Sequence, residues 1–293
     1  MRYRIHHTTS YEYSDMVGHS YNEARLLPRK AQNQILISSR LEISPAESDF
    51  RVREDFFGNQ VAYFSVTEPH REFTVSAISD VEVSESVGQL DFSRGISWEA
   101  VKETLRTDRQ PETLDARQYM LNSPYIEASA ELAEYALRSF TPGRPLIEIV
   151  HELMQRIYKD FVFDPEFTTL ATPLKTVLEF RRGVCQDFAH LAIGCMRSHG
   201  LAARYVSGYI ETLPAPGMEK LVGSDASHAW FSVYLPDIGW MDFDPTNNQV
   251  PSGQHIIVAW GRDYADVTPL KGVVFGGLSH ELNVSVNVEK LGI

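Results

Sequence analysis

Three residues of the sequence, Cys185, His228 and Asp244, have the side chains of a cysteine nucleophile, its base and the group that orients the base. A cysteine attacks a carbonyl as its thiolate, a histidine moves the protons, and a carboxylate holds that histidine in one tautomer. Cys185 follows Gly183-Val184 at the start of a predicted helix. Unpaired backbone N–H groups and the positive end of the helix dipole favour a thiolate there, and they can also hold an oxyanion. These features indicate a nucleophile that attacks a carbonyl group, and a buried core thiol is the competing interpretation of Cys185.

A predicted hairpin brings the base and the carboxylate together. His228 and Asp244 lie on the predicted strands 228–235 and 239–244, at positions symmetric about Pro236. Opposed residues of an antiparallel pair project from the same face, with Cβ atoms roughly 5 Å apart. We therefore expect the two side chains to be close enough to hydrogen-bond. A metal site of His228, Asp242 and Asp244, with Cys185 as a fourth ligand, is an alternative, although such a mixed ligand set is seldom used.

Cys195 is the other cysteine of the chain, and we interpret it as a buried core thiol because it lies in the apolar segment 191–196. Ten residues along one helix separate it from Cys185 by about 15 Å, which excludes a disulfide between them. We expect His190, five residues after Cys185, to point away from the thiol. The sequence gives no reason to treat the following as more than ordinary surface or strand histidines: His6, His7, His199 and His255.

The elements that must position these residues fall into two domains and a connector. Residues 1–90 show alternating β-forming residues and predict an antiparallel β-domain with a hairpin turn at 57–60. Residues 91–125 read as a connector that contains one helix, 98–106. The predicted strands of the β-domain are 3–5, 11–13, 35–43, 61–66 and 73–83.

Residues 126–293 are expected to form the catalytic core, a helical layer against an antiparallel sheet. The nucleophile lies on the helix 185–198, which Gly200 closes. The other predicted helices are 128–140, 145–158 and 174–180, and the predicted strands are 203–212, 228–235, 239–244, 255–260 and 281–289. The fold class is therefore α+β.

Composition narrows the possible functions. The chain has 293 residues, 43% hydrophobic and 23% charged, as in soluble globular proteins, and a net charge of −12 that would repel a phosphate backbone. Nucleic acid is therefore not expected as a partner. No apolar run approaches the roughly 20 residues of a membrane span, and no secretory leader is evident, so we expect a cytoplasmic protein with no membrane partner. The oligomeric state stays open.

Four sequence blocks resemble the bacterial transglutaminase-like family. They are Gly183-Val184-Cys185-Gln186-Asp187-Phe188, Tyr205-Val206-Ser207-Gly208-Tyr209, Asp225-Ala226-Ser227-His228-Ala229-Trp230 and Gly239-Trp240-Met241-Asp242-Phe243-Asp244-Pro245-Thr246. The blocks occur in the family's order and spacing, and residues 1–90 are similar to the β-rich region that precedes the core in one bacterial branch. The resemblance implies a papain-like core in which Cys185 is the nucleophile, His228 the acid and base, and Asp244, rather than Asp242, the orienting residue.

The resemblance implies a peptide or amide substrate and a thioester intermediate. Resolution by water would make the protein a cysteine protease or amidase, which is our leading expectation; resolution by an amine would make it a transglutaminase or amide ligase. A catalytically silent binding module is a third possibility. Gln186 stands where eukaryotic transglutaminases have a tryptophan, and no calcium-loop pattern of acidic residues is present, so no cofactor is expected.

Further residues near these blocks are candidates to contact substrate. They are Trp230, Trp240, Arg262, Asp263 and Tyr264. A polar loop directly after a buried strand often faces a site. The competing interpretation is that the two tryptophans pack the hairpin and that Arg262 and Asp263 fix a loop.

Overall fold

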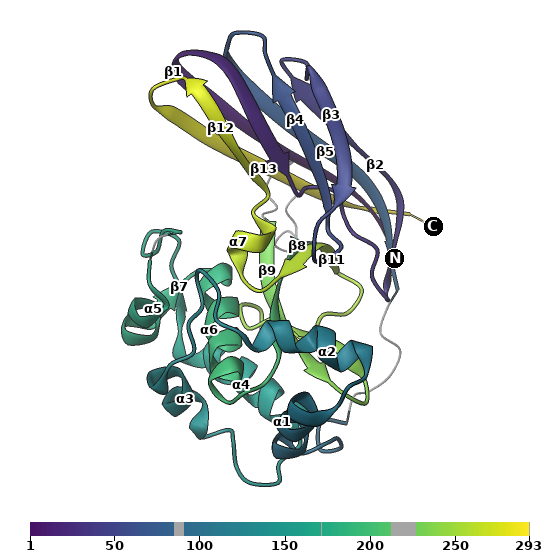
Figure 1. Ribbon diagram of the computed structural model, residues 1–293, viewed down its shortest axis with the longest axis vertical. Coiled ribbons are helices and arrows are strands. Elements are labelled where there is room, and N and C mark those ends of the chain that lie inside the picture. The colour runs from purple at the N-terminus through teal and green to yellow at the C-terminus, as the bar shows by residue number, and fades with distance from the viewer. Residues whose placement is uncertain (85–90, 171, 212–226, 293) are drawn as a thin grey trace, which may run out of the picture.

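The computed structural model describes residues 1–84, 91–170, 172–211 and 227–292, and it places a long antiparallel sheet above a core of helices and a second sheet (Figure 1). The sequence-based assignments at Thr212, Asp225 and Ala226, and the predicted boundary at residue 90, lie outside these described residues. The elements of the upper sheet are β1 (Arg2–Ala24), β2 (Gln34–Ser44), β3 (Asp49–Glu54), β4 (Gln60–Val66), β5 (His70–Val83), β12 (Leu270–Gly276) and β13 (His280–Leu291).

The upper sheet has β1 at its centre. β5 and then β4 pair with β1 on one edge, and β13 and then β12 pair with it on the other. Alternate side chains of β1, such as Tyr3 and Ile5, are buried, as expected for a strand with one face on a core. The sequence predicted a single core from 126 to 293, whereas the last two strands pair in the N-terminal sheet. Both ends of the chain therefore build one sheet.

The lower part holds the segment that resembles an enzyme core. Its helices are α1 (Trp98–Thr107), α2 (Pro111–Arg117), the 3-10 turn η1 (Gln118–Met120), α3 (Ala130–Leu137), α4 (Leu146–Asp160), α5 (Leu174–Phe180), α6 (Cys185–Ser198) and α7 (Tyr264–Val267). Its strands are β6 (Val162–Phe163), β7 (Arg182–Gly183), β8 (Ala203–Ile210), β9 (Ser227–Leu235), β10 (Gly239–Phe243) and β11 (His255–Gly261). None of the helices among the described residues is long and apolar enough to span a membrane.

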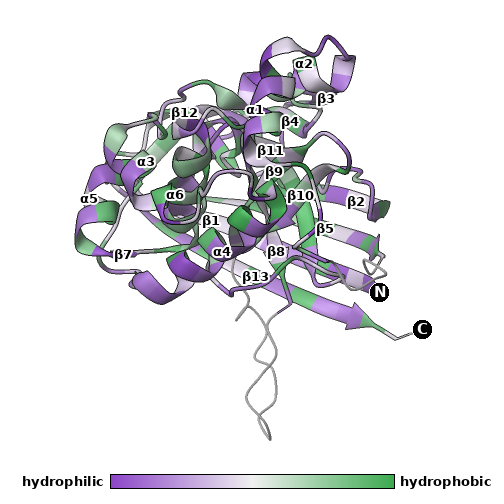
Figure 2. Ribbon diagram, turned by 90° about the horizontal axis from the view of Figure 1, so that it is seen from below, coloured by the Kyte–Doolittle hydropathy of each residue, from purple (hydrophilic) through white to green (hydrophobic). Residues whose placement is uncertain are grey.

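A four-stranded antiparallel sheet in the order β10-β9-β8-β11 supports the central helix α6. The face toward α6 carries Tyr205, Phe231 and Phe243, which join one buried apolar cluster with the helix. Figure 2 shows that the helices around α6 carry both hydrophilic (purple) and hydrophobic (green) residues. Because α6 is buried along most of its length, its first residue is held at a fixed place above the sheet.

Most predicted elements are confirmed, and the fold class α+β is confirmed with them. The helices 174–180 and 185–198 have the predicted ends, and Gly200 adopts the left-handed conformation that closes the second. The predicted turn at 57–60 joins β3 to β4. Two predictions were incomplete: the strands 3–5 and 11–13 are parts of β1, and the expected connector contains a second helix, α2, which begins at Pro111.

Candidate active site

Cys185 is the first residue of α6 and is partly exposed. The intrahelical hydrogen bonds begin with Phe188, whose N–H donates to the Val184 carbonyl. The N–H groups of the helix residues before Phe188 therefore come before this series of bonds. The Asp187 carboxylate accepts the Val184 N–H at 2.8 Å and the Thr168 hydroxyl at 2.7 Å, and burial raises the pKa of Asp187. These bonds give Asp187 the role of fixing the start of the helix.

Gly183 is required for this local structure. A Cβ at this position would lie 2.7 Å from the Asp187 carboxylate oxygen and 2.8 Å from its Cβ, closer than real Cβ atoms approach. The glycine therefore lets the chain enter the helix beside the carboxylate that caps it.

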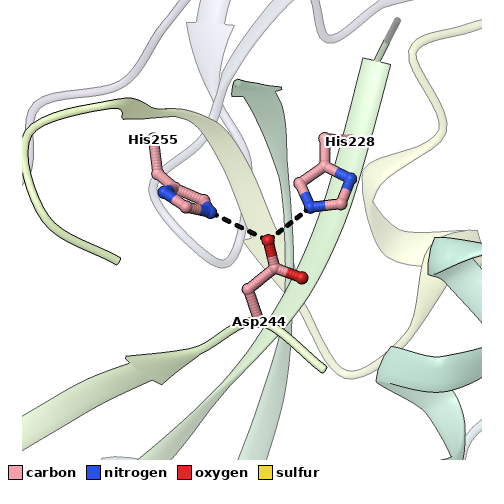
Figure 3. A group of neighbouring side chains, drawn as sticks. All are labelled: His228, Asp244 and His255. Atoms are coloured by element: carbon pink, nitrogen blue, oxygen red, sulfur yellow. Dashed lines mark hydrogen bonds and ion pairs between the residues drawn. The ribbon is translucent and has the colours of Figure 1, made fainter. Parts of the chain in front are cut away.

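His228 lies at the start of β9, is almost fully buried, and links the thiol to a carboxylate. Its Nε2 is 2.7 Å from Asp244 Oδ2 (Figure 3). Burial opposes the charged form of the ring, but its interactions with Asp244 and with the nearby Cys185 thiol outweigh burial and raise the pKa of His228 from 6.5 to about 10. These two partners therefore favour the imidazolium form of the ring.

The Asp244 carboxylate is completely buried and accepts hydrogen bonds on both oxygens. Oδ2 accepts from His228 and, at 2.8 Å, from Asn247 Nδ2, while Oδ1 accepts the backbone N–H groups of Thr246 and Asn247. Burial disfavours the charged carboxylate, but its imidazole partners hold the pKa of Asp244 well below its usual range. Asp244 is therefore an anion fixed in one orientation.

The hairpin explains how this pair forms from residues sixteen apart. β9 and β10 are antiparallel, and Phe231 is the partner of Phe243 in the register. Asp244 follows Phe243, so this register places it opposite Trp230, on the same face as His228 and two residues from it along β9. The two side chains are therefore diagonal neighbours, close enough to hydrogen-bond as the sequence predicted.

His255 was not identified from the sequence as part of this site. It begins β11, is buried, and its Nε2 lies 3.0 Å from Asp244 Oδ2, so that two imidazoles share one carboxylate oxygen (Figure 3). Its ring is 6.0 Å from that of His228, centre to centre. The signal that could have indicated it is Gly208, which has no side chain and pairs with His228 on one side and Ile257 on the other.

The donor types of His228, Asp244 and His255 are also those of a metal site, with ligand atoms within 4.8 Å of one another. Their direct hydrogen bonds at 2.7 and 3.0 Å account for their positions without an ion. The metal set considered from the sequence contained Asp242 instead. Asp242 lies on β10, where it pairs with Ser232 of β9. It is near the buried Arg204 and stabilises the charged form of that guanidinium.

The two candidate tryptophans have different surroundings. Trp230 is fully buried and packs against His228 and His255, with ring centres 6.0 and 5.1 Å away. Its role is therefore to pack against the two imidazoles. Trp240 packs edge-on against Tyr119 and has the Arg204 guanidinium over its ring. It lines a cavity of about 1170 Å³ between the upper sheet, α2 and the β9–β10 hairpin. Cys185 and His228 are not among the residues that line this cavity.

The loop after β11 is tied into the structure. Arg262 forms an ion pair with Asp266 at 2.9 Å, and the buried Asp263 accepts the N–H groups of Tyr125 and Ala265. The Tyr264 N–H donates to Nε2 of the buried His190, whose pKa is lowered from 6.5 to about 3 by burial and by Arg197. His190 thus holds this loop, consistent with the expectation that it turns away from the thiol.

Cys195 is completely buried in α6, and burial raises its pKa to about 12. It is an inert thiol at neutral pH, as the apolar segment around it predicted. The two cysteines of the chain therefore have opposite environments on one helix.

This fold and site agree with the comparisons to known families. Residues 3–82 match the bacterial transglutaminase-like N-terminal region, and residues 133–245 match the transglutaminase-like superfamily. The chain belongs to the transglutaminase-like superfamily, whose members are typically cysteine-based enzymes, and the predicted family is confirmed.

Several relatives extend this match to nearly the whole chain. The uncharacterized protein Rv2569c of Mycobacterium tuberculosis is 43% identical over 98% of this chain and 92% of its own length. The uncharacterized protein ML0607 of Mycobacterium leprae is 34% identical over 99% of both chains. A crystal structure from Cytophaga hutchinsonii, provisionally named a cysteine protease, has the same fold, with a TM-score of 0.76 and 21% identity over 100% of this chain and 91% of that one.

Proposed function

We propose that this protein is a cysteine hydrolase of peptide or other amide bonds. The observation that carries the proposal is the position of His228, which is hydrogen-bonded to Asp244 and close enough to the Cys185 thiol for the two side chains to interact. In this arrangement a proton can pass from the thiol to the imidazole and later to the leaving amine. The partly exposed Cys185 leaves room for a substrate, while its two partners are shielded from water.

The reaction would proceed in two stages. The Cys185 thiolate attacks the amide carbonyl, and N–H groups at the start of α6 stabilise the oxyanion. As the C–N bond breaks, the His228 imidazolium gives its proton to the departing amine and leaves a thioester on Cys185. Water, deprotonated by His228, then attacks the thioester, which releases the acid and returns the proton to the thiol pair. Asp244 keeps the imidazole oriented through both stages.

Transfer of the acyl group to an amine is the second candidate. It is supported by a stretch of 108 residues that is 32% identical to a protein-glutamine gamma-glutamyltransferase of Pseudomonas aeruginosa, covering 35% of this chain and 16% of that protein. The two reactions share every step up to the thioester and differ only in whether water or an amine resolves it.

Alkylation by iodoacetamide tests the proposed nucleophile before any substrate is known. We expect Cys185 to react at pH 6–7 much faster than an ordinary thiol, because an imidazolium partner favours the thiolate. His228→Ala should remove this advantage. Mass spectrometry of the peptides separates Cys185 from the buried Cys195, which serves as the unreactive reference. Equal slow reaction of Cys185 in both proteins would contradict the proposal and favour a silent binding module.

Product analysis then separates the two reactions. Denatured casein is incubated with the protein, with and without methylamine, and the products are weighed by mass spectrometry. Hydrolysis predicts peptide cleavage or loss of side-chain ammonia that methylamine does not alter, and Cys185→Ala should abolish it. Covalent incorporation of methylamine in place of hydrolysis would instead support the transferase.

A further inference from the structure

We propose that His255 is a positioning residue that holds Asp244 in place for His228; this inference rests on the function proposed above. The Nε2 atoms of the two histidines lie 2.7 and 3.0 Å from the same oxygen, Asp244 Oδ2 (Figure 3). The backbone N–H groups of Thr246 and Asn247 and the Asn247 side chain also hold this carboxylate. The second imidazole adds a charge-assisted hydrogen bond from another strand, which a rotation of the carboxylate would break.

The protonation pattern of the two rings follows from the carboxylate. Asp244 is an acceptor only, so each histidine must donate its Nε2 proton. Asn247 Nδ2 also donates to Oδ2, at 2.8 Å, and its 3.2 Å approach to His228 Nε2 is then a contact between two donors. In His228 this leaves Nδ1 as the ring nitrogen available to the thiol, while His255 Nδ1 is buried with no hydrogen-bond partner among the described residues.

The surroundings of His255 restrict it to this orientation. The ring packs edge-on against the fully buried Trp230, 5.1 Å away between ring centres. On the strand, His255 is paired with Ile210, two residues from Gly208. A Cβ on Gly208 would lie 2.0 Å from the Ile256 carbonyl oxygen and 2.6 Å from the Trp230 ring. The absent side chain therefore permits β11 to approach β9 across β8, so that both imidazoles reach one carboxylate.

Among the described residues His255 forms no hydrogen bond or ion pair with the thiol, so it acts through Asp244. This distinguishes it from His228, which touches both partners. His255 therefore makes the orientation of the carboxylate, and with it that of the His228 ring, depend on β11 as well as on the hairpin.

Two matched substitutions test this role. His255→Gln retains an N–H donor near the position of Nε2, whereas His255→Met fills similar space without one. We expect His255→Met to lower the rate of Cys185 alkylation at pH 7 by about tenfold, the value of one charge-assisted hydrogen bond, and His255→Gln to restore most of it. The pH profile of the rate should shift in the Met variant alone. If packing were the only role of His255, the two variants would behave alike.

Proton NMR of protein labelled with ¹⁵N in its histidines supplies a second measurement. The wild type should show two low-field Nε2–H signals, from His228 and His255, and His255→Met should lose one and shift the other. Continued protection of Cys195 from iodoacetamide shows that each variant is folded. An unmoved His228 signal with a wild-type alkylation rate would overturn the inference. Failure of His228→Ala to change alkylation would instead overturn the function on which it rests.

Discussion

Gln34 in the N-terminal sheet forms two hydrogen bonds with the main chain of Ile257 in β11. Its Nε2 donates to the Ile257 carbonyl at 2.7 Å, and its Oε1 accepts the Ile257 N–H at 2.8 Å. Asn59 does the same for Trp260, at 2.8 and 2.9 Å. Two side-chain amides thus occupy the edge of the lower sheet as a neighbouring strand would. The N-terminal domain thereby fixes the strand that carries His255.

Gln34→Leu should therefore weaken both the fold and the site. The variant leaves the N–H and C=O of Ile257 without a partner in a buried place, and we expect the free energy of unfolding to fall by about 3 kcal/mol. Urea denaturation measures this loss. Gln60→Leu is the matched control, because among the described residues the Gln60 side chain bonds only to the exposed Glu54. Equal effects of the two changes would refute the proposed support of β11.

Gly208→Ala should disrupt the meeting of the two imidazoles. The new methyl group would collide with the Ile256 carbonyl oxygen, so β11 must move away from β8. We expect a loss of about 2–3 kcal/mol in unfolding free energy and slower alkylation of Cys185. Gly18→Ala adds the same methyl group in β1, where the nearest atom would be 3.6 Å away, and should have little effect. A stable, fully reactive Gly208→Ala protein would show that the close approach is dispensable.

Replacing Arg197 should lower the free energy of unfolding more than replacing an exposed arginine. It is buried in α6 and donates to the carbonyls of Tyr119, Ala203 and Arg262 and to the Ser123 hydroxyl. Arg197→Met leaves these acceptors unpaired, and we expect a loss of at least about 3 kcal/mol in thermal or urea unfolding. Arg106→Met, which removes an exposed ion pair with Glu103, should change stability by less than about 0.5 kcal/mol.

His7 should make the protein sensitive to mild acid. It is buried between the hydroxyls of Tyr209 and Thr9, and burial lowers its pKa from 6.5 to about 4. Between pH 6.5 and 4 the unfolded chain therefore binds a proton at this ring that the folded protein does not bind. The free energy of unfolding consequently decreases as pH falls from 6.5 toward 4. We expect His7→Gln to reduce the loss in unfolding free energy between pH 7 and 4.5 by about 2 kcal/mol. An unchanged pH dependence in the variant would contradict this.

The sequence predicted the parts of the site that local signals determine. The start of α6 at Cys185, its end at Gly200 and the hairpin between His228 and Asp244 all follow from nearby residues. His255 could not be identified in this way, because β11 reaches the site only by pairing with β8, and strand order is a property of the whole sheet. The same reason applies to β12 and β13, whose partner β1 lies at the other end of the chain.

The position of β1 at the centre of the upper sheet has a consequence for synthesis. One edge of this strand is covered by residues 270–291, which a ribosome makes after the segment that holds the site. The segment containing Cys185, His228 and Asp244 therefore leaves the ribosome while β1 still has an open edge. Such an edge can pair with other chains. The nascent protein must therefore protect β1 from such pairing until β12 and β13 have been made.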